Sequence, residues 1–189
     1  MSNPIEVRWH ARGGQGAVTA SKLLAMSAFA EGKYVQAFPE YGSERTGAPI
    51  QAFTRLDDCE IKIHSQITNP DVVLVLDSTL LDAVDVTAGI KDNGIVLVNS
   101  DKSAADIKKK LGVSQKVYVI DANKISLDEL GRVIPNTPMI GALVKATGAL
   151  NKDKLIDTFK QSFGKKFSAS VLKGNVKAIS RAYGEVTSA

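Results

Sequence analysis

Short runs of apolar residues alternate along this chain with stretches in which apolar residues recur at helical spacing. Apolar and polar positions alternate over residues 5–9, and residues 72–76 form an unbroken apolar run, typical of a strand buried on both faces. The same criteria predict strands at 34–38, 95–98 and 116–120, and helices at 17–31, 80–87, 101–111, 122–131, 138–149, 152–163 and 169–183. This order predicts an α/β fold with a Rossmann-like, doubly wound, mostly parallel sheet and a helical C-terminal tail. We expect residues 1–189 to form a single domain.

The first predicted helix has a continuous buried face and a glycine at its end. The positions that share this face follow helical spacing: Ala20, Leu23, Leu24, Ser27 and Ala28. Gly32 stands where a C′ residue belongs. The later helix at 138–149 is apolar almost throughout, which predicts a place in the core or in an interface.

Two β-rich runs, 50–56 and 61–64, flank Asp57 and Asp58 and predict an antiparallel hairpin inserted into the sheet. Before them, residues 39–49 contain two prolines, two glycines and three charged residues, which predict an irregular loop. Such a long loop is often functional.

Composition narrows the function classes. The chain has 24 Lys and Arg against 20 Asp and Glu, a net charge of +4 that suits an acidic ligand but is no nucleic-acid signature. There is no apolar run long enough for a membrane span and no signal-peptide pattern, so we expect a cytoplasmic protein without membrane contact. The lysines of the C-terminal helices form a solvated face or, alternatively, a surface for an acidic partner.

The sequence offers no catalytic or metal-binding constellation of its own. Its single cysteine, Cys59, lies among acidic residues rather than the basic ones that surround a reactive thiol, and no C-x-x-C motif exists. His10 and His64 have no nucleophile nearby in sequence, and two histidines are too few for a histidine-rich metal site. We therefore predict no catalytic residue and no metal ligand in this chain.

The candidate ligand-binding residues lie in a glycine-rich turn, residues 12–16, between the first predicted strand and the first predicted helix. Exposed N–H groups and the positive end of a helix dipole make such a turn an anion site, usually for phosphate. The dinucleotide pattern is incomplete, because Ala11 takes the place of its first glycine and no acid ends the strand at 34–38. The alternative is that the glycines only let the helix pack closely on the sheet.

Three cations could assist at this turn. Arg12 lies within it, Lys22 lies in the following helix with its side chain leaning toward the N-terminus, and Arg45 lies in the long loop. Alternatively, Lys22 is solvated and Arg45 pairs with Glu44 or Glu40.

Four segments of the chain resemble a known protein family. They are residues 12–20, 38–49, 69–71 and 136–142. They resemble the gamma subunits of 2-oxoacid:ferredoxin oxidoreductases, most of all those that act on pyruvate. The resemblance implies decarboxylation of a 2-oxoacid on thiamine diphosphate, electron transfer through iron–sulfur clusters to ferredoxin, and release of an acyl-CoA. It also implies that thiamine diphosphate and magnesium lie on alpha and beta subunits, and the clusters on a delta subunit.

The resemblance further implies a share in coenzyme A binding, although this chain alone holds no cofactor. Gly13, Gly14, Gly16 and Lys22 match the family's turn and helix lysine, and Arg45 falls where single-chain relatives carry lysines. The residues predicted to bind the co-substrate are Arg12, Gly13, Gly14, Gln15, Gly16, Lys22, Glu44 and Arg45. The isolated chain is expected to be inactive and to self-associate through an apolar face. The alternatives are an assembly scaffold without a ligand, or a free-standing flavin or nicotinamide enzyme.

Overall fold

A seven-stranded sheet forms the centre of the protein. The computed structural model describes residues 4–40 and 47–189. Across the sheet the strands lie in the order β2-β3-β1-β4-β5-β6-β7. Their bounds are β1 Ile5–Arg12, β2 Tyr34–Glu40, β3 Pro49–Asp57, β4 Val72–Val75, β5 Ile95–Asn99, β6 Lys116–Ile120 and β7 Thr187–Ser188.

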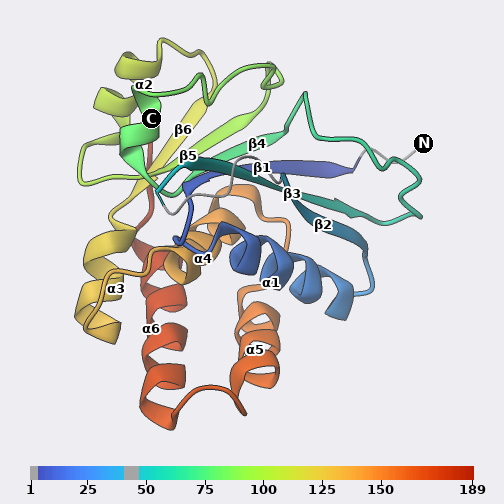
Figure 1. Ribbon diagram of the computed structural model, residues 1–189, viewed down its shortest axis with the longest axis vertical. Helices are drawn as coiled ribbons and strands as arrows, with labels where there is room; N and C mark the ends of the chain where they lie inside the picture. The colour runs from blue at the N-terminus through green and yellow to red at the C-terminus, as the bar shows by residue number, and fades with distance from the viewer. Residues whose placement is uncertain (1–3, 41–46) are drawn as a thin grey trace.

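Six α-helices and one short 3-10 helix accompany the sheet in the described part of the chain. Their bounds are α1 Ala17–Ala30, η1 Ser78–Leu81 (the 3-10 helix), α2 Ala104–Leu111, α3 Ala122–Leu130, α4 Asn136–Thr147, α5 Lys152–Phe163 and α6 Ala169–Glu185. Figure 1 shows α2 on one side of the sheet and α1, α4, α5 and α6 on the other. None of the described helices is long and apolar enough to cross a lipid bilayer.

The sheet combines a parallel half with an antiparallel half. Strands β1, β4, β5 and β6 pair in parallel, whereas β3 runs antiparallel between β1 and β2, and β7 runs antiparallel to β6. The predicted α/β class with helices on both faces of a mostly parallel sheet is confirmed, because only β3 and β7 oppose the common direction.

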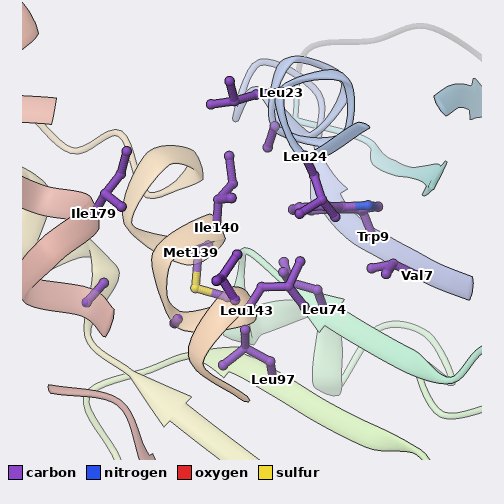
Figure 2. Close-up of a cluster of buried hydrophobic side chains, with 14 of the residues drawn as sticks. Val7, Trp9, Leu23, Leu24, Leu74, Leu97, Met139, Ile140, Leu143 and Ile179 are labelled. Carbon is purple, nitrogen blue, oxygen red and sulfur yellow. The ribbon is translucent and has the colours of Figure 1, made fainter. Parts of the chain in front are cut away.

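Alternate residues of the central strands enter two separate cores. Trp9, Leu74 and Leu97 point toward the helix layer of α1 and α4, where they meet Leu24 and Leu143 (Figure 2). On the other face, β4 and its neighbours pack against α2 and the chain around η1. Strands covered on both faces must be apolar at every position, which explains the unbroken apolar runs of the sequence.

Helix α4 lies in the core of the protein, which is one of the two places predicted for it, the core or an interface. Its residues from Thr137 to Val144 are buried, and a Cβ on Gly141 would lie 2.3 Å from the carbonyl oxygen of Ile179. The small residue therefore lets α4 and α6 cross in direct backbone contact. The predicted buried face of α1 is also confirmed, and Gly32 has a positive φ of 87° at the end of that helix.

The hairpin predicted between 50–56 and 61–64 is wrong. β3 pairs along its length with β1 on one edge and with β2 on the other, so no edge remains for the second run. Instead the chain after β3 crosses the face of the sheet, where the side chains of Gln36 and Arg55 donate to the carbonyl oxygens of Ile61 and Ile63. The antiparallel neighbours of β3 are β1 and β2, and β2 directly precedes β3 in the chain.

The predicted helix at 80–87 is reduced to η1, which ends at Leu81. Two later carbonyl groups, those of Val86 and Ala88, accept hydrogen bonds from the Arg8 guanidinium at 3.0 and 2.6 Å. These bonds hold the segment across the buried face of β1 rather than in a helix. The following helix, α2, begins after Ser103, whose hydroxyl caps it by accepting from the N–H of Asp106.

Candidate functional site

The glycine-rich turn joins the carboxyl end of β1 to the first residue of α1. It lies at a topological switch point, since the chain continues from β1 toward the β2 side of the sheet and from β4 toward the β5 side. Ligands of open α/β sheets bind in the crevice outside the carboxyl ends of such strands. The strand order therefore places the turn at this crevice.

Two glycines of the turn adopt conformations that other residues avoid. Gly14 has a φ of 95° and Gly16 a φ of 81°. A Cβ on Gly16 would also lie 2.5 Å from the side-chain nitrogen of Asn136, at the start of α4. Gly16 thus permits a close approach of α1 to α4, so part of the glycine pattern serves packing.

Gln15 ties the turn to the end of β4. Its side-chain oxygen accepts from the N–H of Arg12 at 2.8 Å, and its side-chain nitrogen donates to Asp77 at 2.7 Å. Burial opposes ionisation of Asp77, but hydrogen bonds from Thr79 and Gln15 and the charge of Arg12 outweigh it and keep the pKa of this carboxyl below its ordinary value. A charged Asp77 therefore anchors the turn.

The Arg12 guanidinium already forms hydrogen bonds within the protein. It donates to the hydroxyl of Thr79 at 2.8 and 3.1 Å and to the carbonyl oxygen of Gly47 at 3.1 Å, and it lies 3.4 Å from Asp77. The backbone of Gly13 is occupied as well, since it exchanges hydrogen bonds with Ala48 and Gly47. These contacts join the turn to the last described residues of the long loop.

A hollow of about 330 Å³ opens beside the turn, and we call it the turn hollow. Its lining comes from the turn, from the chain after β4, and from α3 and the segment before α4: Gly14, Gln15, Leu76, Asp77, Ser78, Thr79, Asn123, Val133, Ile134 and Pro135. Among the residues that the structure describes, no side chain caps the N-terminus of α1. The first N–H groups of a helix lack intrahelical partners, so the positive end of α1 can attract an anion bound at the turn.

Of the residues predicted to bind a ligand, Gly14 and Gln15 line the turn hollow. Lys22 lies elsewhere, in a largely apolar groove of about 440 Å³ between α1, β2 and α5, which we call the α1 groove. The same groove is lined by Met26 and Phe29, whose side chains are 48% and 70% exposed. Glu44 and Arg45 lie outside the described residues.

Sequence reasoning missed the wall of the turn hollow that follows β4. In the sequence, Asp77, Ser78 and Thr79 are typical only of a helix cap before the predicted helix at 80–87. Their position directly after a buried parallel strand is the pattern that could have identified them, because such strands end at the same edge as β1. The part contributed by residues 133–135 has no local pattern of this kind.

His10 is not poised for acid–base chemistry. Burial first, and then the nearby Arg8 charge, lower the pKa of His10 to about 4, although Asp85 opposes this shift. Its Nε2 accepts a hydrogen bond from Arg8 at 3.1 Å. His64 and Cys59 are exposed. Within residues 4–40 and 47–189, no cluster of three or more His, Cys, Asp or Glu side chains could hold a metal ion.

Similarity to known proteins extends over nearly the whole chain. The profile of the family described as pyruvate ferredoxin/flavodoxin oxidoreductase matches residues 6–185. The pyruvate synthase subunit PorC of Thermotoga maritima is 49% identical over 182 residues, which cover 96% of this chain and 94% of that protein. The pyruvate/ketoisovalerate oxidoreductases common subunit gamma of Pyrococcus furiosus is 52% identical over 180 residues, 95% of each chain.

Solved structures agree with this assignment. The crystal structure of the pyruvate oxidoreductase subunit from Thermotoga maritima matches with a TM-score of 0.87 at 44% identity, covering 98% of both chains. A 2-oxoglutarate:ferredoxin oxidoreductase from Magnetococcus marinus shares the fold, with a TM-score of 0.78 at 18% identity over 97% of this chain and 31% of that one. The chain therefore belongs to the pyruvate ferredoxin/flavodoxin oxidoreductase family, in which it corresponds to the gamma-type subunits.

Proposed function

We propose that this chain is the gamma subunit of a pyruvate-type 2-oxoacid:ferredoxin oxidoreductase and that its turn hollow helps to bind the phosphates of coenzyme A. The assembled enzyme would convert pyruvate and coenzyme A to acetyl-CoA and carbon dioxide and pass the electrons to ferredoxin. The chain would act as a binding subunit within the complex, in the cytoplasm, and would be inactive alone.

The observation that carries this proposal is the turn hollow itself. It lies at the carboxyl ends of β1 and β4, and no side chain of residues 4–40 or 47–189 caps the N-terminus of α1 beside it. Backbone N–H groups at such a helix start favour phosphate oxygens. The Magnetococcus marinus structure, which shares this fold, contains coenzyme A.

The redox and thiamine chemistry would belong to partner subunits. An iron–sulfur cluster needs several cysteine ligands, and this sequence has one. We expect thiamine diphosphate and magnesium on the alpha and beta subunits and the clusters on the delta subunit. Ferredoxin would then meet the complex rather than this chain.

A second candidate function is an assembly scaffold that contacts no ligand. The α1 groove favours it, because Phe29 and Met26 expose apolar surface beside Lys22. Exposed apolar surface of this kind usually marks an interaction site. In this function the groove would pack against a partner subunit, and the isolated chain would self-associate through it.

Two matched serine substitutions separate the candidates. Ser78→Asp adds a negative charge to the turn hollow, and Ser162→Asp adds the same charge to the α1 groove. At roughly 6 Å from a phosphate and an effective dielectric constant of about 40, the added charge costs about 1.4 kcal/mol, or about tenfold in affinity. The assay is pyruvate-dependent electron-acceptor reduction by the assembled complex at varied coenzyme A, with assembly followed by size-exclusion chromatography.

If the proposal holds, Ser78→Asp raises the apparent KM for coenzyme A about tenfold without loss of assembly, and Ser162→Asp leaves this KM unchanged. The scaffold function predicts an unchanged KM for both variants and weaker assembly for Ser162→Asp. Calorimetric titration of the wild-type chain with NAD and with coenzyme A adds a third arm. Binding of NAD but not of coenzyme A would overturn the proposal in favour of a dinucleotide enzyme.

A further inference from the structure

The side chain of Asn123, the second residue of α3, lines the turn hollow. Its side-chain oxygen accepts a hydrogen bond from the side-chain nitrogen of Asn99 at 3.0 Å, whereas none of the residues at 4–40 and 47–189 forms a hydrogen bond with its side-chain nitrogen. An amide has one end that accepts and one end that donates. The donor end of Asn123 is therefore available to a ligand.

The buried side chain of Asn99 determines which end of Asn123 is available. Its Oδ1 accepts from the N–H of Ala122 at 2.9 Å, and its Nδ2 donates to the carbonyl oxygen of Leu76 at 2.8 Å. A backbone N–H can only donate and a carbonyl oxygen can only accept, so these two bonds fix the orientation of the Asn99 amide. The Nδ2 of Asn99 needs an acceptor in Asn123, which turns the Asn123 oxygen toward Asn99 and leaves the Asn123 amino group unused.

The carboxylate of the turn hollow is already saturated with hydrogen bonds. Oδ1 of Asp77 accepts from the N–H and the hydroxyl of Thr79, and Oδ2 accepts from Gln15 at 2.7 Å and lies 3.4 Å from the Arg12 guanidinium. The Thr79 hydroxyl also accepts from Arg12, and the second end of the Gln15 amide accepts from the Arg12 N–H. A donor group of a ligand would have to displace one of these bonds to reach Asp77.

The side-chain groups that remain for a ligand are mainly donors. Within the described part of the chain they are the amino group of Asn123 and the hydroxyl of Ser78, which has no hydrogen-bond partner there. The first N–H groups of α1 are donors as well. The apolar part of the lining consists of Leu76, Val133, Ile134 and Pro135. The turn hollow therefore favours a group with several acceptor oxygens, such as phosphate.

The charge of the lining distinguishes between kinds of phosphate. The lining residues that the structure describes include no lysine or arginine and one aspartate. A phosphate monoester carries about −1.5 to −2 charges at pH 7, whereas each phosphate of a diphosphate bridge carries one. Neutral donors suit the smaller charge. The hollow of about 330 Å³ lies at the lower end of the ~300–1,000 Å³ range of small-molecule pockets, so it can hold part of coenzyme A but not the whole molecule.

We propose that the turn hollow takes the diphosphate bridge of coenzyme A rather than its 3′-phosphate, and that Asn123 binds it by donating from Nδ2 to a phosphate oxygen. This inference rests on the proposed function, because it assumes that coenzyme A is the ligand. Asn99 acts only by orienting the Asn123 amide, and Ser78 supplies a second donor from the end of β4.

Asn123→Ala removes the donor without adding charge, and Asn123→Asp keeps the acceptor toward Asn99 while replacing the donor by a charged oxygen. We expect the apparent KM for coenzyme A of the assembled complex to rise about tenfold for Asn123→Ala and further for Asn123→Asp, with kcat unchanged at saturating coenzyme A. The matched controls are Asn93→Ala and Asn93→Asp. Asn93 is exposed before the amino end of β5, at the opposite edge of the sheet, so its variants should leave this KM within about twofold.

Dephospho-coenzyme A, which keeps the diphosphate and lacks the 3′-phosphate, identifies the phosphate. We expect Asn123→Ala to weaken its competition with coenzyme A by the same factor as it raises the KM for coenzyme A. An unchanged KM for Asn123→Ala, a loss confined to coenzyme A, or no competition by dephospho-coenzyme A with the wild type would each overturn the inference. If Ser78→Asp raises the KM and Asn123→Ala does not, only this inference fails; if neither variant changes the KM, the proposed function fails with it.

Discussion

The crossing of α4 and α6 makes a sharp prediction for Gly141→Ala. In most helices this change is favourable, because alanine stabilises a helix interior by up to about 1 kcal/mol relative to glycine. Here the added Cβ would lie 2.3 Å from the carbonyl oxygen of Ile179 and 3.1 Å from its carbonyl carbon and Cα. All three are backbone atoms, so no side-chain rotation can relieve the overlap.

The helices must therefore separate by about 1 Å, which disturbs contacts of the fully buried Ala178, Ile179 and Ala182. Overpacking of this kind typically costs about 1–3 kcal/mol, and an overlap with rigid backbone belongs at or above the upper end. After subtraction of the helix-propensity gain, we expect a net loss of about 2 kcal/mol. For a chain of this length that corresponds to a fall in Tm of roughly 4–8 °C.

The matched control is Gly184→Ala, near the end of α6. No atom of the described residues lies within 4 Å of its added Cβ, so only the propensity gain remains. We expect Gly184→Ala to raise the free energy of unfolding by about 0.5 kcal/mol. Urea unfolding followed by far-ultraviolet circular dichroism measures both variants. If Gly141→Ala is as stable as Gly184→Ala, α4 and α6 can move apart at no cost, and the packing argument is refuted.

Three further predictions concern the turn, a buried histidine and a buried amide. Gly16→Ala should cost about 2 kcal/mol, since it combines a left-handed backbone with an overlap on Asn136, and Asn136→Ala should recover part of this loss in a double-mutant cycle. The pKa of His10 is about 4 in the folded protein against 6.5 in the unfolded chain, so the unfolded state binds more protons between these values. This difference in pKa makes the free energy of unfolding about 3 kcal/mol larger above pH 6.5 than at low pH, and that stability is lost as the pH falls toward 4. Urea unfolding across this range should therefore show a shallower pH dependence for His10→Gln than for the wild type. Asn99→Ala should cost about 2–4 kcal/mol in the same assay, because the carbonyl group of Leu76 and the N–H of Ala122 lose their buried partner; a loss below about 0.5 kcal/mol would contradict this.

Only the glycine-rich turn of the candidate site was predictable from the sequence. The three glycines between a strand and a helix are local in sequence, and they indicated where the turn lies. Asp77 and Pro135 reach the turn hollow from segments that are distant along the chain. Lys22 was expected near the turn, but it shares a helix face with Met26 and Phe29 and lies with them in the α1 groove. Helical spacing of these three residues was the pattern that could have indicated this.

By itself, the sequence determined those strands and helices whose buried residues recur at a regular spacing along the chain. The unbroken apolar runs of β4 and β5 and the one-sided face of α1 follow from which side chains avoid water, and this pattern is local. Only the tertiary structure decided which strands became neighbours. Residues 61–64 alternate as a strand would, yet β1 and β2 already occupy both edges of β3. Strand pairing depends on which backbone edges remain free, and that is a property of the assembled sheet.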